Sequence, residues 1–220
     1  MPSANQAKTP GRTTLLEAVN ICLENIGEQP VDSLNNQQIQ DARMAERTIL
    51  EFHKEGQTCG WSWNTECSVS FKPDPTSKQV LIPPNCVEFA INPYQWNNRF
   101  QVRGSKVYDL LNHTYFIDPQ EIPEITADVV WLLSWDESPE SFNRWTTIRA
   151  ARVYSDRALG SEALFKYTSK DEADAKAEVE KMELAQNHAN ILTGGMHAFP
   201  TYLPGMGLAT RRISNGLAWY

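Results

Sequence analysis

The hydrophobic spacing of this 220-residue chain changes abruptly near residue 61, and that change limits the folds open to it. Before that point apolar residues recur every three or four positions, which is the period of an amphipathic helix. From Trp61 to Phe71 they alternate with polar residues, which is the period of a half-buried strand. Helical spacing returns after Ser138. The pattern predicts an α+β protein in which helices at both ends flank an inserted β region.

Two helices are predicted in the N-terminal part. Thr14 and Glu17 form a capping-box pattern at the start of the first helix, and Gly27 fits its left-handed C-terminal cap. The second helix is predicted to end at Gly56 and Gly60. Because each helix has one apolar stripe, the two are expected to pack as a hairpin. The stripes consist of Leu16, Val19, Leu23 and Ile26 in the first helix and Ile39, Ala42, Ala45, Ile49 and Phe52 in the second.

The central region carries several short apolar segments separated by turn residues, which predicts a small antiparallel β-sandwich or barrel. Pro73, Asp74 and Pro75 interrupt the first strand. Gly104 and Ser105 form a two-residue hairpin turn of the type that has glycine first. The predicted strands are Trp61–Phe71, Val80–Ile82, Val87–Ile91, Phe100–Arg103, Lys106–Asp109, Thr114–Ile117 and Ile125–Trp135.

Two further helices are predicted after the β region. Ser138 is expected to cap the first of them, with Pro139 at its first helical position and Gly160 closing it. A long, mostly charged helix is expected over about Ser161–Leu192, with a narrow apolar seam and a solvated face. The first of these helices has an apolar stripe of Phe142, Trp145, Ile148, Ala151 and Tyr154, and the second has a seam of Ala175, Val179, Met182, Ala189 and Leu192.

These elements divide the chain into four expected parts: a flexible arm at 1–12, a helical platform at 13–60 and 138–193, a β domain at 61–137, and an extended C-terminal arm at 194–220. The C-terminal arm is apolar without periodicity, and a terminal aromatic pair suits docking into a neighbouring protein. The candidate partner-binding residues are Tyr202, Leu203, Ile213, Leu217, Trp219 and Tyr220.

Bulk properties exclude several classes of protein. The formal net charge of −7 gives no sign of a basic surface built to hold nucleic acid. No apolar run approaches the roughly 20 residues of a membrane span. The four cysteines form no C-x-x-C pair and no secretory signal opens the chain, so reduced thiols in a protein made in a cytoplasm are expected. The cysteines are Cys22, Cys59, Cys67 and Cys86.

The sequence holds no recognisable catalytic or metal-binding motif, so no cofactor is expected. The four histidines lack any ligand spacing and are expected at the surface, His53 as a cation at a helix end. Glycoside hydrolysis needs two carboxylates across a cleft, and acids in and around the β region leave that alternative open. The histidines are His53, His113, His188 and His197, and the acids are Asp109, Asp118, Asp128, Asp136, Glu137 and Glu140.

Tryptophan is the most unusual component, with seven residues of which six lie in or beside the β region. Trp63, Trp131 and Trp135 fall on alternating faces, which favours a packed core because each ring buries a large apolar area. An aromatic platform for sugars or nucleobases is the alternative, and it would make the β domain a binding module.

Four short blocks follow one another along the chain, between about Thr14 and Ala189. They are Ile26–Val31, Gly60–Asn64, Val102–Asp109, and Pro139–Phe142 with Trp145 and Ala150–Arg152. In this order they resemble the tail tubular protein A family of short-tailed phages. The residues from about 194 onward do not align with that family.

The resemblance implies a structural role and no enzymatic one. It implies a subunit of a dodecameric ring below the portal, which adapts the portal to the nozzle protein (tail tubular protein B) and gives tail fibres a place to attach. DNA would pass through the channel without specific binding, and no membrane would be involved. The protein would be made in the host cytoplasm and reside in the virion tail. Polysaccharide-degrading activity credited to some members keeps the hydrolase alternative open.

Overall fold

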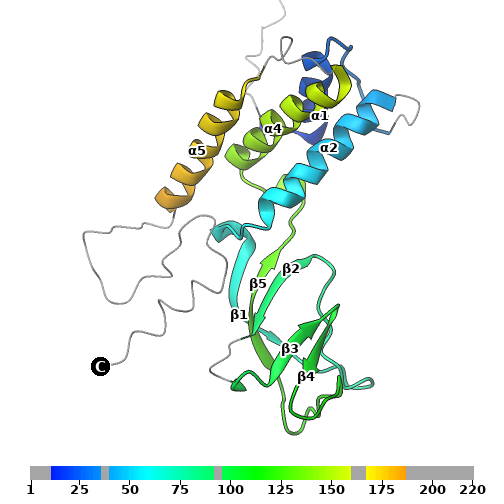
Figure 1. Ribbon diagram of the computed structural model, residues 1–220, viewed down its shortest axis with the longest axis vertical. Coiled ribbons are helices and arrows are strands. Elements are labelled where there is room, and N and C mark those ends of the chain that lie inside the picture. The colour runs from blue at the N-terminus through cyan, green and yellow to red at the C-terminus, as the bar shows by residue number, and fades with distance from the viewer. Residues whose placement is uncertain (1–10, 36–39, 92–95, 160–166, 187–220) are drawn as a thin grey trace, which may run out of the picture. The chain divides into compact units, whose positions relative to one another are not determined.

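The computed structural model describes residues 11–35, 40–91, 96–159 and 167–186 (Figure 1). It has an α+β fold in which helices precede and follow a small antiparallel β region, which confirms the predicted fold class. The contacts between residues divide the chain into two compact units. The helical unit comprises the described residues of Met1–His53 and Trp135–Val179, and the β unit comprises those of Lys54–Ser134 and Glu180–Tyr220.

The first helix, α1 (Leu15–Asn25), begins and ends as its sequence predicts. Thr14 caps it in a capping box, with the Glu17 amide donating to the Thr14 hydroxyl and the Glu17 carboxylate accepting from the Thr14 amide. Gly27 follows the helix with a φ of 83°, a conformation that glycine adopts without steric cost. These local signals were sufficient because they act within one helical turn.

The second helix, α2 (Gln40–Gln57), buries the predicted stripe, although Ile39 lies outside the described residues. The helix ends at Gln57, between the predicted stops at Gly56 and Gly60, and Gly56 itself is buried in its last turn. Gly60 lies after the helix with a φ of 70°. The buried members of the stripe are Ala42, Ala45, Ile49 and Phe52.

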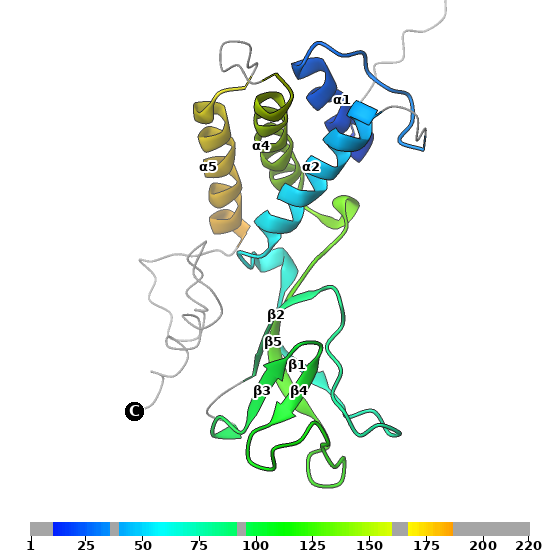
Figure 2. The same cartoon turned by 45° about the vertical axis from the view of Figure 1, so that its right-hand side comes forward.

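Helix α4 (Glu140–Leu159) is the centre of the helical unit (Figure 2). Its predicted apolar stripe is buried, but so are polar residues on its other faces, because other helices pack around it. Asn25 of α1 donates from Nδ2 to the carbonyl of Ala151 at 3.0 Å. The Tyr154 hydroxyl donates to the carbonyl of Asp41 in α2 at 3.2 Å. The buried polar residues of α4 include Asn143, Thr146, Thr147 and Ser155.

Helix α5 (Ser169–Gln186) begins later than the predicted start at Ser161. Thr168 lies before it and exchanges hydrogen bonds with Asp171, which is the pattern of a capped N-terminus. The Glu172 carboxylate accepts a 2.7 Å hydrogen bond from Arg152 of α4. Val179 of the predicted seam is buried and Met182 is exposed, while Ala189 and Leu192 lie outside the described residues.

Residues just before α1 are bound to the segment that leads into α4. Arg12 donates to the carbonyls of Asp136 and Ser138, and Thr13 bonds to the Glu140 carboxylate. The Trp135 indole donates to the carbonyl of Thr13 at 2.8 Å. The chain at Arg12 and Thr13 is therefore fixed within the helical unit.

His53 is not the surface cation predicted from its place near a helix end. Its side chain is buried, with its ring centroid 5.2 Å from that of Trp135 and 5.5 Å from that of Phe142. Burial lowers the pKa of His53 to about 4, so the ring is neutral at pH 7. Trp135 and Phe142 come from distant parts of the sequence, and the helix-end argument could not foresee them.

The β unit contains two antiparallel sheets in its described part. The first has the strand order β1–β5–β2, where β1 is Thr65–Phe71, β2 is Cys86–Ile91 and β5 is Ile125–Trp131. The second is the hairpin of β3 (Phe100–Arg103) and β4 (Lys106–Asp109). The predicted turn is confirmed, since Gly104 has a φ of 61°. Val80, Ile82, Phe100, Val107, Ile117, Ile122 and Ile125 form the buried core.

The first predicted strand is wrong in two respects. Ser62–Asn64 form a short 3-10 helix, so β1 begins only at Thr65. Between Glu66 and Val69 the register against β5 shifts, and Ser68 has a φ of 58°, so strict alternation fails there. Trp61 is buried, whereas Trp63 is only half-buried.

Three other predicted strands differ as well. Val80–Ile82 contributes a single bridge, from Leu81 to Lys106, and Thr114–Ile117 contributes one from Thr114 to Asp109. The last strand, β5, ends at Trp131, and Trp135 instead begins a 3-10 helix over Trp135–Glu137.

Candidate interaction surface

The outer face of the β3–β4 sheet carries aromatic and cationic side chains, of which Arg103 is exposed and Lys106 and Tyr108 are half-buried. Arg103 pairs with Lys106 across the hairpin, and Lys106 in turn forms a bridge with Leu81. Directly opposed residues of neighbouring strands point to the same side of a sheet, so these three side chains form one row. Gln101 and Tyr108 form the next row, while Val107 and Asp109 point inward and are buried.

Aromatic stacking organises this face. The Arg103 guanidinium carbon lies 3.7 Å from the centroid of the Tyr108 ring, close enough for a cation–π contact. The Tyr115 ring packs edge-on against Tyr108, with centroids 4.9 Å apart. Leu81 is 54% exposed at the edge of the same face. We define the outer β face as Leu81, Gln101, Arg103, Lys106, Tyr108 and Tyr115.

The loop beside the outer β face exposes two more large apolar side chains. Leu111 is 69% exposed and Phe116 is 51% exposed. The Lys78 ammonium lies 4.9 Å from the Phe116 ring centroid and 3.8 Å from an Asp118 carboxylate oxygen. Because a strand was predicted at Thr114–Ile117, Tyr115 and Phe116 were not predicted as surface residues, and no pattern in the sequence singled out Leu111.

A buried carboxylate fixes the shape of this loop. Asp109 accepts from the amides of Leu111 and Asn112 at 2.9 and 3.2 Å, and from the Asn112 side chain at 3.1 Å. Arg99 donates to the same carboxylate through Nε at 3.0 Å and Nη2 at 2.8 Å. These hydrogen bonds therefore hold the backbone at Leu111 in place.

The electrostatics of Asp109 favour its charged form. Burial would raise its pKa, but the hydrogen bonds from Arg99 and from the Asn112 and Leu111 amides outweigh burial, so the pKa lies below its ordinary value. The bond to Asp109 is also the main cause of the raised pKa of Arg99. An acid held ionised in this way cannot serve as the proton donor of a glycosidase.

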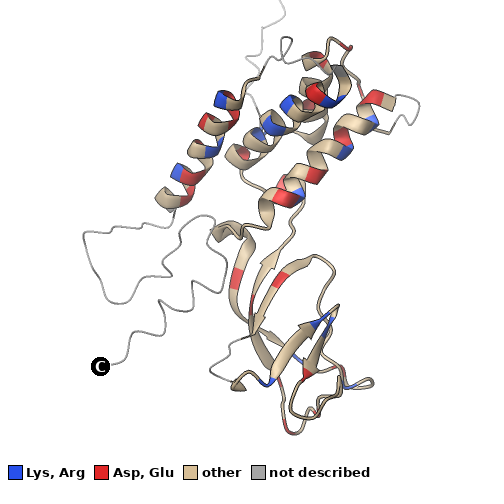
Figure 3. Ribbon diagram, viewed as in Figure 1, with Lys and Arg blue, Asp and Glu red and all other residues tan. Residues whose placement is uncertain are grey.

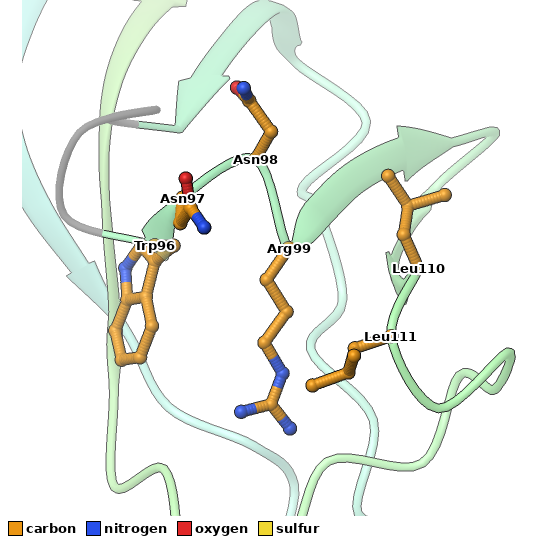
Figure 4. Close-up of a pocket in the computed structure, with 6 residues that line it drawn as sticks. All are labelled: Trp96, Asn97, Asn98, Arg99, Leu110 and Leu111. Carbon is orange, nitrogen blue, oxygen red and sulfur yellow. The ribbon is translucent and has the colours of Figure 1, made fainter.

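A pocket of about 360 Å³ opens next to the loop and is lined by Trp96, Asn97, Asn98, Arg99, Leu110 and Leu111 (Figure 4). Figure 4 shows the Trp96 and Arg99 side chains extending in the same direction, with Leu111 pointing toward Arg99. The guanidinium of Arg99 is already bound to Asp109 and Glu121, so it has little capacity for a ligand. The pocket is therefore lined by aromatic and amide groups, and the charge of Arg99 is already paired with acids.

The other predicted acids are dispersed. Asp128 accepts from the Ser68 amide in the β unit, while Glu140 binds Thr13 in the helical unit. Asp136 and Glu137 belong to the 3-10 helix of the helical unit. In the described stretches of the chain no three His, Cys, Asp or Glu side chains gather as a metal site would require.

The remaining residues that the sequence singled out are the other histidines, the cysteines and the C-terminal apolar residues. His113 is exposed in a turn with a φ of 53°, as a surface histidine would be, whereas His188 and His197 lie outside the described residues. The four cysteines are free thiols, with Cys22 buried. No described helix is long and apolar enough to cross a membrane. The candidate partner-binding residues Tyr202, Leu203, Ile213, Leu217, Trp219 and Tyr220 all lie outside the described residues.

Comparison with known protein families identifies a match. The family model described as "Tube: Tail tubular protein" matches residues 16–189, which is well over half of the chain. No curated protein matches the chain.

Proposed function

Because this chain belongs to the tail tubular protein family and is thus a structural component of a phage tail, we propose that it is the ring adaptor between portal and nozzle. In this role several copies, twelve by the resemblance to tail tubular protein A, surround the channel through which DNA is ejected. The portal, the nozzle protein and the tail fibres are its proposed partners. The protein binds no cofactor and transforms no substrate in this proposal.

The outer β face and the loop beside it support this role most directly. Leu81 of that face and Leu111 and Phe116 of the loop are exposed apolar side chains within one small unit, and such a group favours coverage by another protein. Hydrogen bonds to Asp109 hold the loop in one shape, so little conformational entropy is lost when a partner binds. Stacking of Arg103 on Tyr108 likewise fixes a cation in place.

The chemistry of the described residues supports an assembly role over the hydrolase alternative. Asp109 is the most buried acid of the β unit, and its oxygens are occupied by Arg99 and loop amides. Asp118 pairs with Lys78, and Asp128 binds a backbone amide. Each of these carboxylates has a structural partner, and glycoside hydrolysis requires two that face a substrate.

The arrangement of the chain follows from the same proposal. Residues 13–60 and 138–193 would form the platform of the ring, and residues 61–137 would form a β domain that meets other tail components. The arm at 194–220 would reach a neighbouring subunit through its apolar residues, among them Trp219 and Tyr220. An apolar arm that orders on contact adds affinity without a preformed groove of its own.

The proposal is tested with the purified full-length chain and the portal and nozzle proteins of the same phage. Size-exclusion chromatography with light scattering is expected to show the chain in a complex with both proteins. The double variant Tyr108→Ser/Tyr115→Ser, which removes the stacked rings, should bind at least one partner at least tenfold more weakly. A matched control is Val87→Ser, which alters an exposed apolar residue outside the outer β face.

Two results would count against this function. One is a chain that binds neither the portal nor the nozzle protein. The other is release of reducing sugar from capsular polysaccharide that depends on Asp118 or Asp128, because it would restore the hydrolase alternative. Deletion of 194–220 tests the arm separately, and it should leave the fold intact while it weakens attachment to the portal.

A further inference from the structure

The exposed side of α2 carries two cations with an apolar residue between them. Arg47, Leu50 and Lys54 lie three and then four residues apart along this continuous helix, so they occupy one side of it. All three are exposed, and they lie away from the buried stripe that contains Ala45 and Ile49. We define Arg47, Leu50 and Lys54 as the basic stripe.

The acids of α2 leave the basic stripe positively charged. Charges of both signs lie along α2, as Figure 3 shows, but they fall on different sides of the helix. Glu51 is turned toward Arg157 of α4, with a 3.4 Å contact between them. Glu46 is half-buried at the edge of the stripe and offsets part of its charge, whereas the exposed Arg43, one turn before Arg47, adds to it.

Helix α1 exposes the opposite charge with the same spacing in reverse. Glu17, Ile21 and Glu24 lie four and then three residues apart, on the side of α1 away from the buried Val19 and Cys22. Both acids are exposed, and Ile21 between them is half-buried. We define Glu17, Ile21 and Glu24 as the acidic stripe.

No cation of its own segment offsets the acidic stripe. From Thr13 to Asn35 the sequence has four acids and no lysine or arginine. Arg12, just before this segment, donates to the carbonyls of Asp136 and Ser138. Among the residues that the structure describes, no ion pair involves a member of either stripe. The charges of both stripes are therefore available to a partner.

A groove of about 480 Å³ opens beside the acidic stripe, and its lining includes Glu17, Asn20, Ile21, Glu24 and Pro30. The Asn20 side chain bonds to both the amide and the carbonyl of Val31, so the loop after α1 is held against the helix. The groove thus has an apolar side chain between two carboxylates. It suits a partner that presents an apolar side chain between two cations.

The two stripes of one molecule do not face each other. Helices α1 and α2 bury their other sides in the same core, to which α1 contributes Val19 and Leu23 and α2 contributes Ala45 and Ile49. Each stripe lies on the side of its helix that points away from this core. A second molecule is therefore needed to bring the stripes together.

We infer that the basic stripe of α2 binds the acidic stripe of α1 in a neighbouring copy of this chain, with the two helices antiparallel. The charged residues of each stripe are seven positions apart, about 10 Å along the helix axis, so both charged pairs can form at once. The contacts are Arg47 with Glu24, Leu50 with Ile21, and Lys54 with Glu17. A ring of identical subunits requires two such different, complementary surfaces joined head to tail. The inference rests on the proposed ring, for which it names the surfaces that meet.

A copy of the same chain fits the basic stripe better than DNA does. Leu50, which is 41% exposed, has no counterpart on a phosphate backbone, whereas Ile21 offers it apolar contact. A long polyanion would also be repelled by a molecule with a net charge of −7. Arginine binds a carboxylate through a planar pair of donors, which suits Arg47 to a single exposed acid.

The test uses single charge reversals in the full-length protein. Arg47→Glu places an acid opposite Glu24, and Glu24→Arg places a cation opposite Arg47. Sedimentation velocity over a range of concentrations in low salt should show self-association weakened at least tenfold in each variant. Glu17 is left unchanged because its carboxylate belongs to the capping box of α1. Lys72→Glu, a reversal at an exposed lysine of the β unit, is the control and should self-associate like the wild type.

The decisive experiment restores complementarity. In a mixture of the two variants every contact can join either a wild-type pair or a fully reversed pair. Association of the mixture should therefore return to within about threefold of the wild type. The double variant Glu24→Arg/Arg47→Glu, which reverses both charges in one chain, should also associate. Circular dichroism and thermal melting verify that each variant is folded.

Three outcomes would overturn the inference: single variants that associate like the wild type, a mixture that stays dissociated, or a wild type that forms no multimer either alone or with the portal protein. The proposed function is judged separately, through binding to the portal and nozzle proteins. If wild type and variants bind those proteins equally well, the adaptor role stands and only the assigned contact is lost.

Discussion

The Nε2 atom of His53 lies 2.9 Å from the hydroxyl oxygen of Ser138, and both residues are buried in the helical unit. His53 belongs to α2, whereas Ser138 belongs to the segment that leads into α4. The pair therefore joins two parts of the helical unit that are distant in sequence. The ring also packs against Trp135 and Phe142, and its burial disfavours the charged form.

Protonation of His53 should make stability depend on pH. Its pKa is about 4 in the folded chain and about 6.5 when unfolded, so between these values the unfolded state binds more protons. Stability should therefore fall as the pH drops from about 6.5 to 4, by roughly 2–3 kcal/mol in total. Urea denaturation across that range measures the loss.

The variant His53→Gln is the control for this pH dependence. Glutamine does not titrate, so the dependence between pH 6.5 and 4 should be reduced by most of the effect seen in the wild type. Acids with lowered pKa values, such as Asp109, contribute equally in both proteins and cancel in the comparison. An identical slope in wild type and variant would contradict the assignment.

Asp109→Asn should destabilise the β unit by about 2–3 kcal/mol, because it leaves the largely buried Arg99 guanidinium without its main counter-charge. Amide hydrogen exchange of residues 110–116 should also become faster, since the loop amides lose a charged acceptor. Asp118→Asn is a matched control at an exposed pair with Lys78 and should change stability by less than about 1 kcal/mol. Equal effects of the two variants would refute the role given to Asp109.

Gly104→Val should destabilise the hairpin by about 1–2 kcal/mol through backbone strain alone. Its φ is 61°, but no atom lies within 4 Å of an added Cβ. Gly104→Asn should destabilise the hairpin by only a small part of that amount, because asparagine tolerates this conformation. Thermal melting compares the two, and a valine variant as stable as the asparagine variant would argue against strain.

Trp61→Ala should destabilise the β unit by about 3–5 kcal/mol, the range for loss of a buried large side chain. Trp61 is 2% exposed, and its indole donates to the carbonyl of Gly56 at 2.8 Å. Trp63→Ala is the comparison and should cost about 1–2 kcal/mol, since that ring is half-buried. The reverse order in urea denaturation would show that Trp63 is the core residue, as the alternation of the sequence first suggested.

Features that depend on a few neighbouring residues were predictable from the sequence. The capping box of Thr14 and Glu17, the left-handed Gly27 and the turn at Gly104 all lie where the sequence placed them. Each is decided by bonds or backbone angles within one turn. Longer periodicities were less reliable, because the bulge near Ser68 and the 3-10 helix at Ser62–Asn64 interrupt what reads as one strand.

The candidate surface was less predictable than the fold. Tyr108 and Arg103 could be placed in a hairpin from the sequence, but their stacking depends on strand register. Exposure of Leu111 and Phe116 depends on the loop that Asp109 holds, and nothing in the sequence identifies Arg99 as the partner of that acid. The arm at 194–220 was predicted to bind partners, and that remains a prediction.

The sequence by itself determined the class of the fold, the order of helices and strands, and the family resemblance, because all three are written in local patterns and short blocks. Only the tertiary structure decided that His53 is buried and neutral, and that Asp109 accepts hydrogen bonds from the loop that follows it. The physical reason is that burial and charge state depend on which distant residues surround a group. For His53 those residues are Trp135, Ser138 and Phe142, which no local pattern around it reveals.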